Sequence, residues 1–432
     1  MTLLGALSRL VSRSKEPPSE TPNPVSLSSL NQKVGEVTMA AIDEASHNKM
    51  RFSIYDAKFR GIVMQLAAIG GVTAFAYFII SNTAKNLLDR GISTGFGFVS
   101  TPAGYDVSQM LVFFPEPVTH GQMFIVGLLN TLVVAGLGVV LATILGLVMG
   151  IMRMSLNWLS AGVAYAYVDS LRNVPVLLQI LFWYGVLLAL PGVRQSIGLF
   201  GIAQLNNRGL FVPQPIVQDG FGLVLLAFAL AIAASVALAV WARKRQRETG
   251  EAFPVIQSSI ALIVVLPVLT YFLSGRPLEW DFPVQKGFGF NGGMVISPEF
   301  TALLLALVLY TGTYIAEIFR SAIQSVSTGQ REAAAALGLQ PNQMMKLVLI
   351  PQAMRVAVPQ LTSQYLNLTK NSSLAVAIGY PDLVATFGGT TLNQTGQAVE
   401  VIAITMGVYL TISLLISVFM NWFNACVALK ER

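Results

Sequence analysis

Long apolar segments recur along this chain and constrain its fold more than any other feature. A helix that crosses the hydrocarbon core of a bilayer needs about 20 predominantly apolar residues. Runs of this kind begin and end near Ile62 to Ser81, Phe124 to Ile151, Val174 to Leu190, Leu223 to Trp241, Val255 to Leu273, Phe300 to Ile318, Ala353 to Thr369 and Val401 to Phe423. The sequence therefore predicts an all-α membrane protein with about eight transmembrane helices.

Composition excludes two other classes of protein. Hydrophobic residues make up 54% of the chain and charged residues only 11%, whereas about a quarter of the residues in soluble globular domains are charged. The net charge of +6 does not indicate a nucleic-acid partner, because the basic residues stand at the ends of apolar runs and form no single stripe. These basic residues indicate instead which ends of the spans face the cytoplasm.

The distribution of basic residues predicts the orientation in the membrane. With eight spans, the polar N-terminal tail of residues 1–60 and the later inner loops carry most of the lysines and arginines, which satisfies the positive-inside rule. Both termini are thus expected to be cytoplasmic, and the Ser-, Pro- and Glu-rich tail to be flexible. The stretch Trp158 to Leu171 contains Asp169 and precedes Arg172, so we interpret it as a helix that enters from the cytoplasmic interface, not as a ninth span.

Few single residues in this sequence indicate chemistry. His47 and His120 lie far apart and have no cysteine neighbours, which argues against a metal site. Cys426 is the only cysteine and is expected to be a small core residue. Gly146 and Gly150 are four residues apart, a spacing that indicates close helix packing, with a specific dimer contact as the alternative.

A polar segment between the sixth and seventh apolar runs predicts a helix, a turn and a second helix on the cytoplasmic face. Glu332 to Ala336 favour a helix, Gly338 can end it in a left-handed turn, and Pro341 can begin the next one. From these residues alone, the element either caps the helix bundle or binds a partner.

The spacing within this segment resembles the EAA loop of ABC importer permeases. That pattern is EAA, three residues, G, nine residues, then I, any residue, L and P. Here it is carried by Glu332, Ala333, Ala334, Gly338 and Pro351, with Val348 and Ile350 in place of the usual Ile and Leu. Flanking segments such as GTYIAEIFRSAIQSV and LNLTKNSSLAVAIG are similar to the polar amino acid permease group, which includes histidine, glutamine and arginine importers.

The resemblance implies a map of the chain. A permease domain of residues 122–425 would hold a five-helix core, with an inserted two-helix hairpin at about 192–298 and a coupling loop at 329–351. Residues 61–121 would add one helix and an outer loop before it, and residues 426–432 a cytoplasmic tail. Together with RFSIYDAKFRG, this enlarged plan looks like the longer permease subunit of general L-amino acid importers of the bacterial inner membrane.

The resemblance also implies partners and a site. In that family the loop fits a groove on a separate ATPase and transmits its closure, and it is assigned here to Gly329, Gln330, Glu332, Ala333, Ala334, Gly338 and Pro351. The expected complex holds two copies of the ATPase, a second permease that is a paralogue, a periplasmic binding protein and an L-amino acid, in contact with membrane lipid and with no nucleic acid.

The chain itself lacks the motif that hydrolyses ATP. No G-x-x-x-x-G-K-[ST] phosphate loop occurs in the sequence. We therefore expect a subunit that is not an enzyme and holds no cofactor, with ATP and Mg²⁺ bound by the partner ATPase.

Polar residues inside apolar runs indicate a substrate path or internal pairing, because a charge at a helix centre costs about 2.5 to 3.5 kcal/mol. Glu317 and Arg320 stand three residues apart and favour an ion pair over substrate contact. Lys370, Asn371, Ser372 and Ser373 interrupt an apolar helix, and either line a substrate path or form an ordinary helix end.

Two other classes of function remain as alternatives. An ion-gradient-driven secondary transporter or channel would show ionisable residues in several spans and inverted repeats with matching broken helices. A membrane-embedded enzyme would need converging His, Asp, Glu or Ser side chains within the spans. Neither pattern is evident in this sequence.

Overall fold

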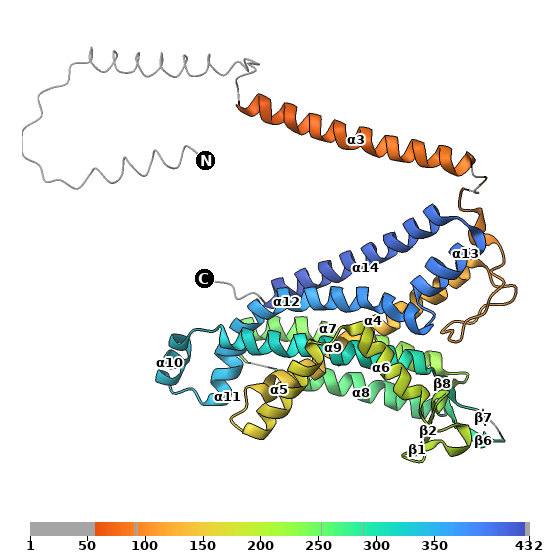
Figure 1. The fold of residues 1–432 in the computed structure, drawn as a ribbon. Helices are drawn as coiled ribbons and strands as arrows, with labels where there is room; N and C mark the ends of the chain where they lie inside the picture. The colour runs from red at the N-terminus through yellow and green to blue at the C-terminus, as the bar shows by residue number, and fades with distance from the viewer. Residues whose placement is uncertain (1–56, 90, 92–93, 252, 288, 428–432) are drawn as a thin grey trace, which may run out of the picture. The chain divides into compact units, whose positions relative to one another are not determined.

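The computed structural model describes residues 57–427 except 90, 92–93, 252 and 288. The chain forms two units, divided after Arg90. The expected N-terminal tail lies almost wholly outside the described residues, as do His47 and most of the C-terminal tail. The fold is predominantly helical (Figure 1).

The first unit contains α3 (Ala57–Asp89). Its apolar side chains are exposed, as in Met64, Val72 and Tyr77. Because α3 has 33 residues and a helix rises about 1.5 Å per residue, it is long enough to cross a bilayer.

The second unit is built on helices that pack side by side. They are α4 (His120–Arg153), α5 (Trp158–Arg172), α6 (Val176–Leu188), α9 (Pro298–Gln324), α12 (Ile350–Asn371) and α14 (Ala398–Val427). Helix α9 packs against α4, α5, α6 and α12, and α14 packs against α12. Helix α9 is thus the centre of this bundle.

Helices occupy all of the predicted apolar runs, but the predicted number of spans is not reproduced. Among the described residues, six helices are long and apolar enough to cross a membrane, or up to seven if α5 and α6, which bend by 105° at their junction, form one broken span. Helix α12 falls outside this set because its 22 residues include glutamine, serine and asparagine side chains.

A hairpin of two long helices separates α6 from α9 in sequence. Helices α7 (Phe221–Thr249) and α8 (Val255–Leu273) pack mainly against each other. Most of their apolar side chains are exposed, as in Leu225, Val264 and Leu269.

Short strands flank this hairpin and were missed in the all-α prediction. They are β1 (Ile197–Leu199), β2 (Ala203–Asn206), β3 (Gly209–Val212), β4 (Gln214–Val217), β5 (Leu278–Asp281), β6 (Val284–Lys286), β7 (Gly289–Asn291) and β8 (Met294–Ile296). All pairings are antiparallel: one sheet has the order β1-β2-β3-β8, β4 pairs with β5, and β6 pairs with β7. Strands of three or four residues are too short to leave a clear alternating pattern in the sequence.

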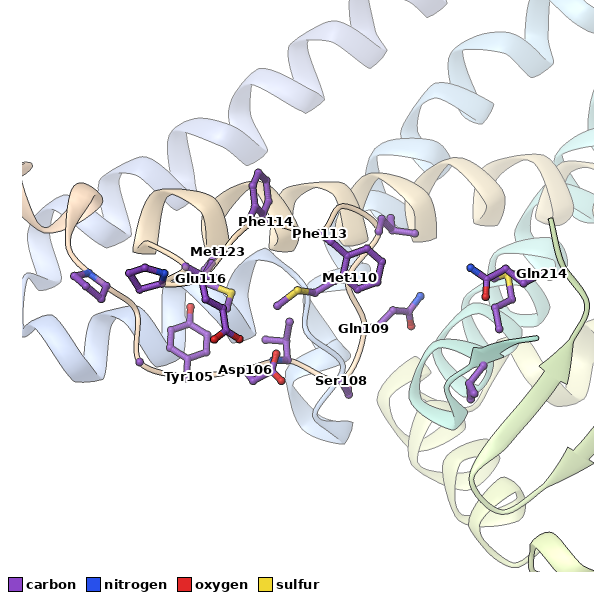
Figure 2. A pocket seen from close by; sticks show the side chains of 18 residues that line it. Tyr105, Asp106, Ser108, Gln109, Met110, Phe113, Phe114, Glu116, Met123 and Gln214 are labelled. Atoms are coloured by element: carbon purple, nitrogen blue, oxygen red, sulfur yellow. The ribbon is translucent and has the colours of Figure 1, made fainter. Parts of the chain in front are cut away.

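The remaining elements lie at the two ends of the bundle. At one end, the loop after α9 forms α10 (Thr328–Ala336), α11 (Pro341–Met344) and the π-helical turn η3 (Met345–Leu349). At the other end are the 3₁₀ turns η1 (Gly97–Ser100) and η2 (Val193–Gln195), and the connection from α12 to α14 through η4 (Ser372–Ile378), η5 (Val384–Thr391) and α13 (Leu392–Thr395). Residues 102–118 and strands β4 and β8 border a pocket at this second end (Figure 2).

Glycines let α4 and α9 approach closely. A Cβ atom on Gly146 would lie 2.5 Å from Ile315 Cγ2, and one on Gly150 would lie 2.9 Å from the carbonyl oxygen of Ala316. Both distances are too short for a real contact, so only glycine fits. The predicted close packing is confirmed, and it occurs between two helices of the same chain.

The prediction for Cys426 is wrong. Its side chain is exposed, in the last turn of α14. The neighbouring Trp422 is also exposed. An apolar run in a membrane protein identifies a span but does not tell which of its residues face protein and which face lipid.

Candidate functional site

The loop between α9 and α12 folds as the predicted helix, turn and helix, and projects from one end of the bundle (Figure 1). Helix α10 has nine residues and α11 four. Pro341 is the first residue of α11, and the backbone N–H of Gln340 donates to Gln343 Oε1 at 3.0 Å, which satisfies a donor that the helix start leaves open.

Gly338 ends α10 in a complete Schellman motif. Its φ is +73°, in the left-handed region that favours glycine. The N–H of Gly338 donates to the carbonyl of Ala335 at 2.9 Å, and the N–H of Leu339 donates to that of Ala334 at 3.2 Å. The glycine of the motif is therefore required by backbone geometry, as the sequence predicted.

The outer surface of α10 is available to a partner. Gly329, Gln330, Glu332 and Ala333 are exposed, whereas Ala334 is buried against the rest of the loop. Leu337, at the tip, is 81% exposed. The sequence reasoning did not single out Leu337, although an apolar residue directly before a helix-ending glycine was a usable signal.

Side-chain contacts fix the loop to the bundle. Arg331 Nη2 donates to the carbonyl of Ile323 at the end of α9, at 3.0 Å. Gln352 Nε2 donates to Gln330 Oε1 at 3.3 Å, which joins the first turn of α12, where Pro351 lies, to α10. Hydrogen bonds therefore connect α10 to both α9 and α12.

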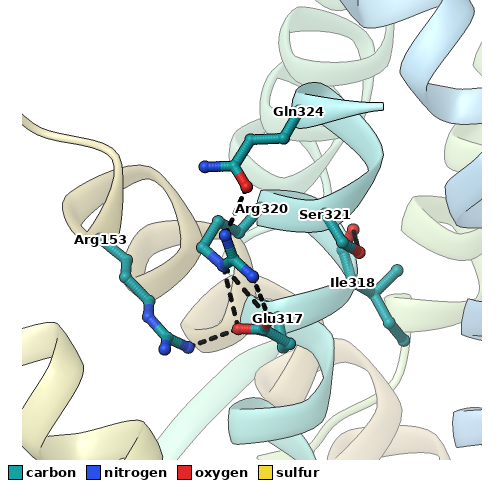
Figure 3. A network of polar contacts seen from close by, with 6 residues as sticks. All are labelled: Arg153, Glu317, Ile318, Arg320, Ser321 and Gln324. Atoms are coloured by element: carbon teal, nitrogen blue, oxygen red, sulfur yellow. Dashed lines mark hydrogen bonds and ion pairs between the residues drawn. The ribbon is translucent and has the colours of Figure 1, made fainter. Parts of the chain in front are cut away.

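An ion cluster joins the last residue of α4 to α9 (Figure 3). Arg320 Nε donates to both carboxylate oxygens of Glu317, at 3.1 and 3.2 Å, so the predicted ion pair is confirmed. Arg153, the last residue of α4, also pairs with Glu317, and Arg320 donates to Gln324. Arg153 is far from Glu317 in the chain, so its part in the cluster was not predicted from the sequence.

Helix α5 is fastened to this cluster and to α9. The guanidinium of Arg153 lies 5.4 Å from the Tyr165 ring centroid, and that of Arg172 lies 5.3 Å from the Tyr314 ring. Tyr167 Oη donates to the carbonyl of Leu309 at 2.7 Å. The last residue of α4 thus belongs to a set of polar and cation–π contacts that also joins α5 to α9.

Lys370, Asn371, Ser372 and Ser373 lie where α12 changes into the 3₁₀ turn η4. Lys370 is exposed, and Ser372 is fully buried with its hydroxyl donating to the carbonyl of Thr369 at 2.7 Å. Ser373 donates in the same way to the carbonyl of Lys370. The four residues are adjacent but do not share one face.

A polar stripe on α12 extends from Lys370 along the helix. Gln360, Ser363, Asn367 and Lys370 are all exposed in this chain. Their spacings of three and four residues place them on one face of the helix. The sequence reasoning identified only the last of them, although the helical spacing was visible.

No metal site is present among the described residues, since no group of three His, Cys, Asp or Glu side chains comes together there. His120 is buried, and its ring Nδ1 is 3.1 Å from the hydroxyl of Thr391. It joins the start of α4 to η5.

Comparison with known proteins gives a consistent result. Residues 229–429 match the family model described as "Binding-protein-dependent transport system inner membrane component". Over 383 residues the chain is 50% identical to the general L-amino acid transport system permease protein AapQ of Rhizobium johnstonii, covering 88% of this chain and 96% of the relative. It is 48% identical to the putative amino-acid ABC transporter permease protein YhdX of Escherichia coli, over 89% and 98% of the two chains.

Among solved structures, one match is a crystal structure of an amino acid ABC transporter with histidines. The identity is 21% and the TM-score 0.41, over 71% of this chain and 94% of that one. The full-length sequence similarity to AapQ and YhdX favours the ABC permease interpretation over a secondary transporter or channel.

Proposed function

Since this chain belongs to the family of amino-acid ABC transporter permeases, we propose that it is the membrane-spanning subunit of an ATP-driven importer of L-amino acids in a bacterial inner membrane. The chain is a permease and not an enzyme, so ATP hydrolysis belongs to another subunit. The substrate class follows from the names of the two relatives, which concern amino acids.

The observation that carries the coupling role is the exposed face of α10. Gln330, Glu332, Ala333 and Leu337 present an amide, a carboxylate and small or apolar groups to solvent. This mixture suits a protein groove, with Leu337 as an apolar anchor and Glu332 as the acceptor of a charge-assisted hydrogen bond. We assign this face to the ATPase, which binds ATP and Mg²⁺.

The anchoring of the loop supports a mechanical role for it. A shift of α10 acts on α9 through Arg331 and on α12 through Gln330 and Gln352. The ion cluster of Glu317 extends this connection to α4 and α5. Closure of the ATPase would thereby move helices as rigid bodies and switch the access of the path.

The polar stripe on α12 is the proposed wall of that path. Polar side chains within a membrane face protein or a water-filled cavity. This chain does not bury the four side chains of the stripe, which are Gln360, Ser363, Asn367 and Lys370. A second permease subunit, a paralogue of this chain, would complete the path, and Lys370 would offer an ammonium group to a substrate carboxylate.

The complete importer would contain two ATPase copies, the two permeases and a periplasmic substrate-binding protein. The test is to purify the chain with these partners, reconstitute it in vesicles and measure amino acid uptake. Uptake should require ATP and the ATPase. Uptake that persists without the ATPase would contradict the proposal.

A charge reversal tests the coupling face itself. Glu332→Lys should reduce ATPase association and coupled uptake about tenfold, while leaving membrane insertion intact. Glu248→Lys is a matched control, since Glu248 is an exposed glutamate in the last turn of α7 and does not belong to the face of α10. Equal effects of the two variants, or no effect of either, would remove the assignment of this face.

A further inference from the structure

A cavity of about 990 Å³ opens at the end of the bundle opposite the coupling loop (Figure 2). We call it the outer pocket. Its lining consists mainly of the loop of residues 102–118, with Met123 from α4, Gln214 from β4, and Met294 and Val295 from β8.

The position of the outer pocket follows from α4. The pocket lies beside the start of α4, and the last residue of that helix, Arg153, pairs with Glu317 near the coupling loop. Helix α4 has 34 residues and spans about 50 Å at 1.5 Å per residue. With the coupling loop on the ATPase side, the outer pocket faces the other side of the membrane.

The loop that forms the pocket is firmly held. Tyr105 Oη donates to the carbonyl of Thr386 at 3.2 Å, and burial raises the pKa of this hydroxyl, so it stays protonated as a donor. Asn130 Nδ2 donates to the carbonyl of Gln109 at 3.0 Å, and Ser297 Oγ donates to Gln109 Oε1 at 3.2 Å. The pocket is therefore a preformed surface.

The chemistry of the lining favours a cation flanked by apolar groups. Asp106 and Glu116 are exposed carboxylates, and no lysine, arginine or histidine is among the lining residues. Phe113 is 85% exposed, and Met110 and Phe114 are half-buried. A free α-amino acid always carries a carboxylate, for which this pocket offers no cationic side chain. Its volume is also at the upper end of the range of about 300 to 1,000 Å³ for small-molecule sites, more than one amino acid fills.

The origin of the lining residues points to a partner protein. Apart from Met123, they come from residues 102–118, which precede the permease core, and from the inserted segment that contains β4 and β8. The two additions to the minimal permease thus meet at one place. Almost all of this surface therefore belongs to segments outside the minimal core, and it adds a contact surface to the one that the core provides.

We propose that the outer pocket receives a surface loop of the substrate-binding protein, one that presents a lysine or arginine side chain to Asp106 and Glu116 between apolar side chains that contact Met110, Phe113 and Phe114. This docking contact rests on the proposed function and lies on the outer face of the importer. Complementary charge of this kind raises the association rate and fixes the orientation of the partner.

The experiment uses the whole importer in vesicles and the purified, amino-acid-loaded binding protein. ATP hydrolysis is measured against the concentration of binding protein. In the double variant Asp106→Asn with Glu116→Gln, the concentration for half-maximal stimulation should rise about tenfold, with the basal and maximal rates unchanged. Raising the salt concentration should weaken stimulation of the wild type more than that of the variant.

A matched control carries Asp219→Asn with Glu279→Gln, two exposed carboxylates of the inserted segment that do not line the pocket. An unchanged half-maximal concentration in the pocket variant, or the same rise in the control, would overturn the inference. If free L-arginine stimulated hydrolysis without the binding protein, and did so through Asp106 and Glu116, the pocket would be a substrate site and the inference would again be wrong.

Crosslinking gives an independent readout. In a Cys426→Ser background, which removes the only native cysteine, Ser108→Cys at the pocket should crosslink to the binding protein through a thiol-specific photoreagent. Absence of an adduct would contradict the docking contact. A wild-type complex without ATP-dependent uptake would instead contradict the proposed function, so the two failures are distinguishable.

Discussion

The helix pair α4–α9 and the hairpin α7–α8 are alike in hydropathy but differ in burial. All four helices are long and apolar enough to cross a membrane. In the most apolar stretch of α9, however, 61% of the residues are buried, and in that of α8 none are. Hydropathy therefore identifies spans, whereas small residues and polar contacts decide which spans form the packed core.

The largest expected difference between the two pairs comes from filling a glycine contact. Gly146→Leu should prevent α4 from approaching Ile315 of α9, because even a Cβ atom would lie 2.5 Å from its Cγ2. Overpacking typically costs about 1 to 3 kcal/mol, and a side chain as large as leucine at a backbone contact exceeds that range. The measurement is the yield of monodisperse protein in detergent and its melting temperature.

Two matched variants test whether packing is the cause. Gly136→Leu lies on an open face of α4 and Gly222→Leu in the first turn of α7, and neither glycine has a neighbouring atom within 4 Å of its Cβ position. Both should leave the yield nearly unchanged. A similar loss in all three variants would mean that leucine disturbs the helices themselves.

The second-largest effect is expected at the ion cluster, because the ion pairs described in the hairpin are exposed. Glu317→Ala should leave Arg153 and Arg320 without their shared acceptor and lower stability by about 1 to 3 kcal/mol, less than for a fully buried pair because these side chains are 19–27% exposed. Glu248→Ala, which breaks the exposed pair with Lys244 in α7, should have little effect. Thermal unfolding in detergent compares the two, and equal shifts would contradict a special role for the cluster.

This contrast also shows which parts of the structure the sequence could predict. The helix positions, the turn at Gly338, and the pairing of Glu317 with Arg320 each depend on residues near one another in the chain. Arg153 is far from Glu317 in sequence, and strands β1 to β8 are only three or four residues long. Contacts of this kind depend on the packed fold, and local patterns do not contain them.

The candidate site divides in the same way. The helix, turn and helix after α9 were predicted because backbone rules define them, and the coupling role of this loop stays a prediction. The outer pocket was not predicted, since residues 102–118 meet β4 and β8 only after α4, α7, α8 and α9 are arranged. Lys370 to Ser373 were identified by their polarity. The stripe that Lys370 forms with Gln360, Ser363 and Asn367 was recognised only from the exposure of these side chains in the structure.

A smaller effect is expected when the glycines that end α10 and α7 are replaced, and it distinguishes a loss of stability from a loss of coupling to ATP hydrolysis. Gly338 at the end of α10 and Gly250 at the end of α7 both have positive φ, +73° and +77°, and neither has a neighbouring atom within 4 Å of its Cβ position. Alanine at either position should cost about 1 kcal/mol through backbone strain. Only Gly338→Ala should also lower the ratio of amino acid imported to ATP hydrolysed, because α10 is the proposed ATPase contact. An equal ratio in both variants would contradict this.

The smallest predicted effect compares a hydrogen bond between helices with one inside a helix. The Thr143 hydroxyl of α4 lies 2.9 Å from Tyr365 Oη of α12, whereas the Ser235 hydroxyl of α7 donates only to the carbonyl of Ala231 in its own helix. Hydrogen bonds between membrane helices contribute about 0.6 kcal/mol on average and at most about 1.7. Thr143→Val should therefore lower the melting temperature slightly and Ser235→Ala should not, because only the first variant removes a contact between helices. A larger loss for Ser235→Ala would show that the hairpin, and not the α4–α9–α12 bundle, limits the stability of the chain.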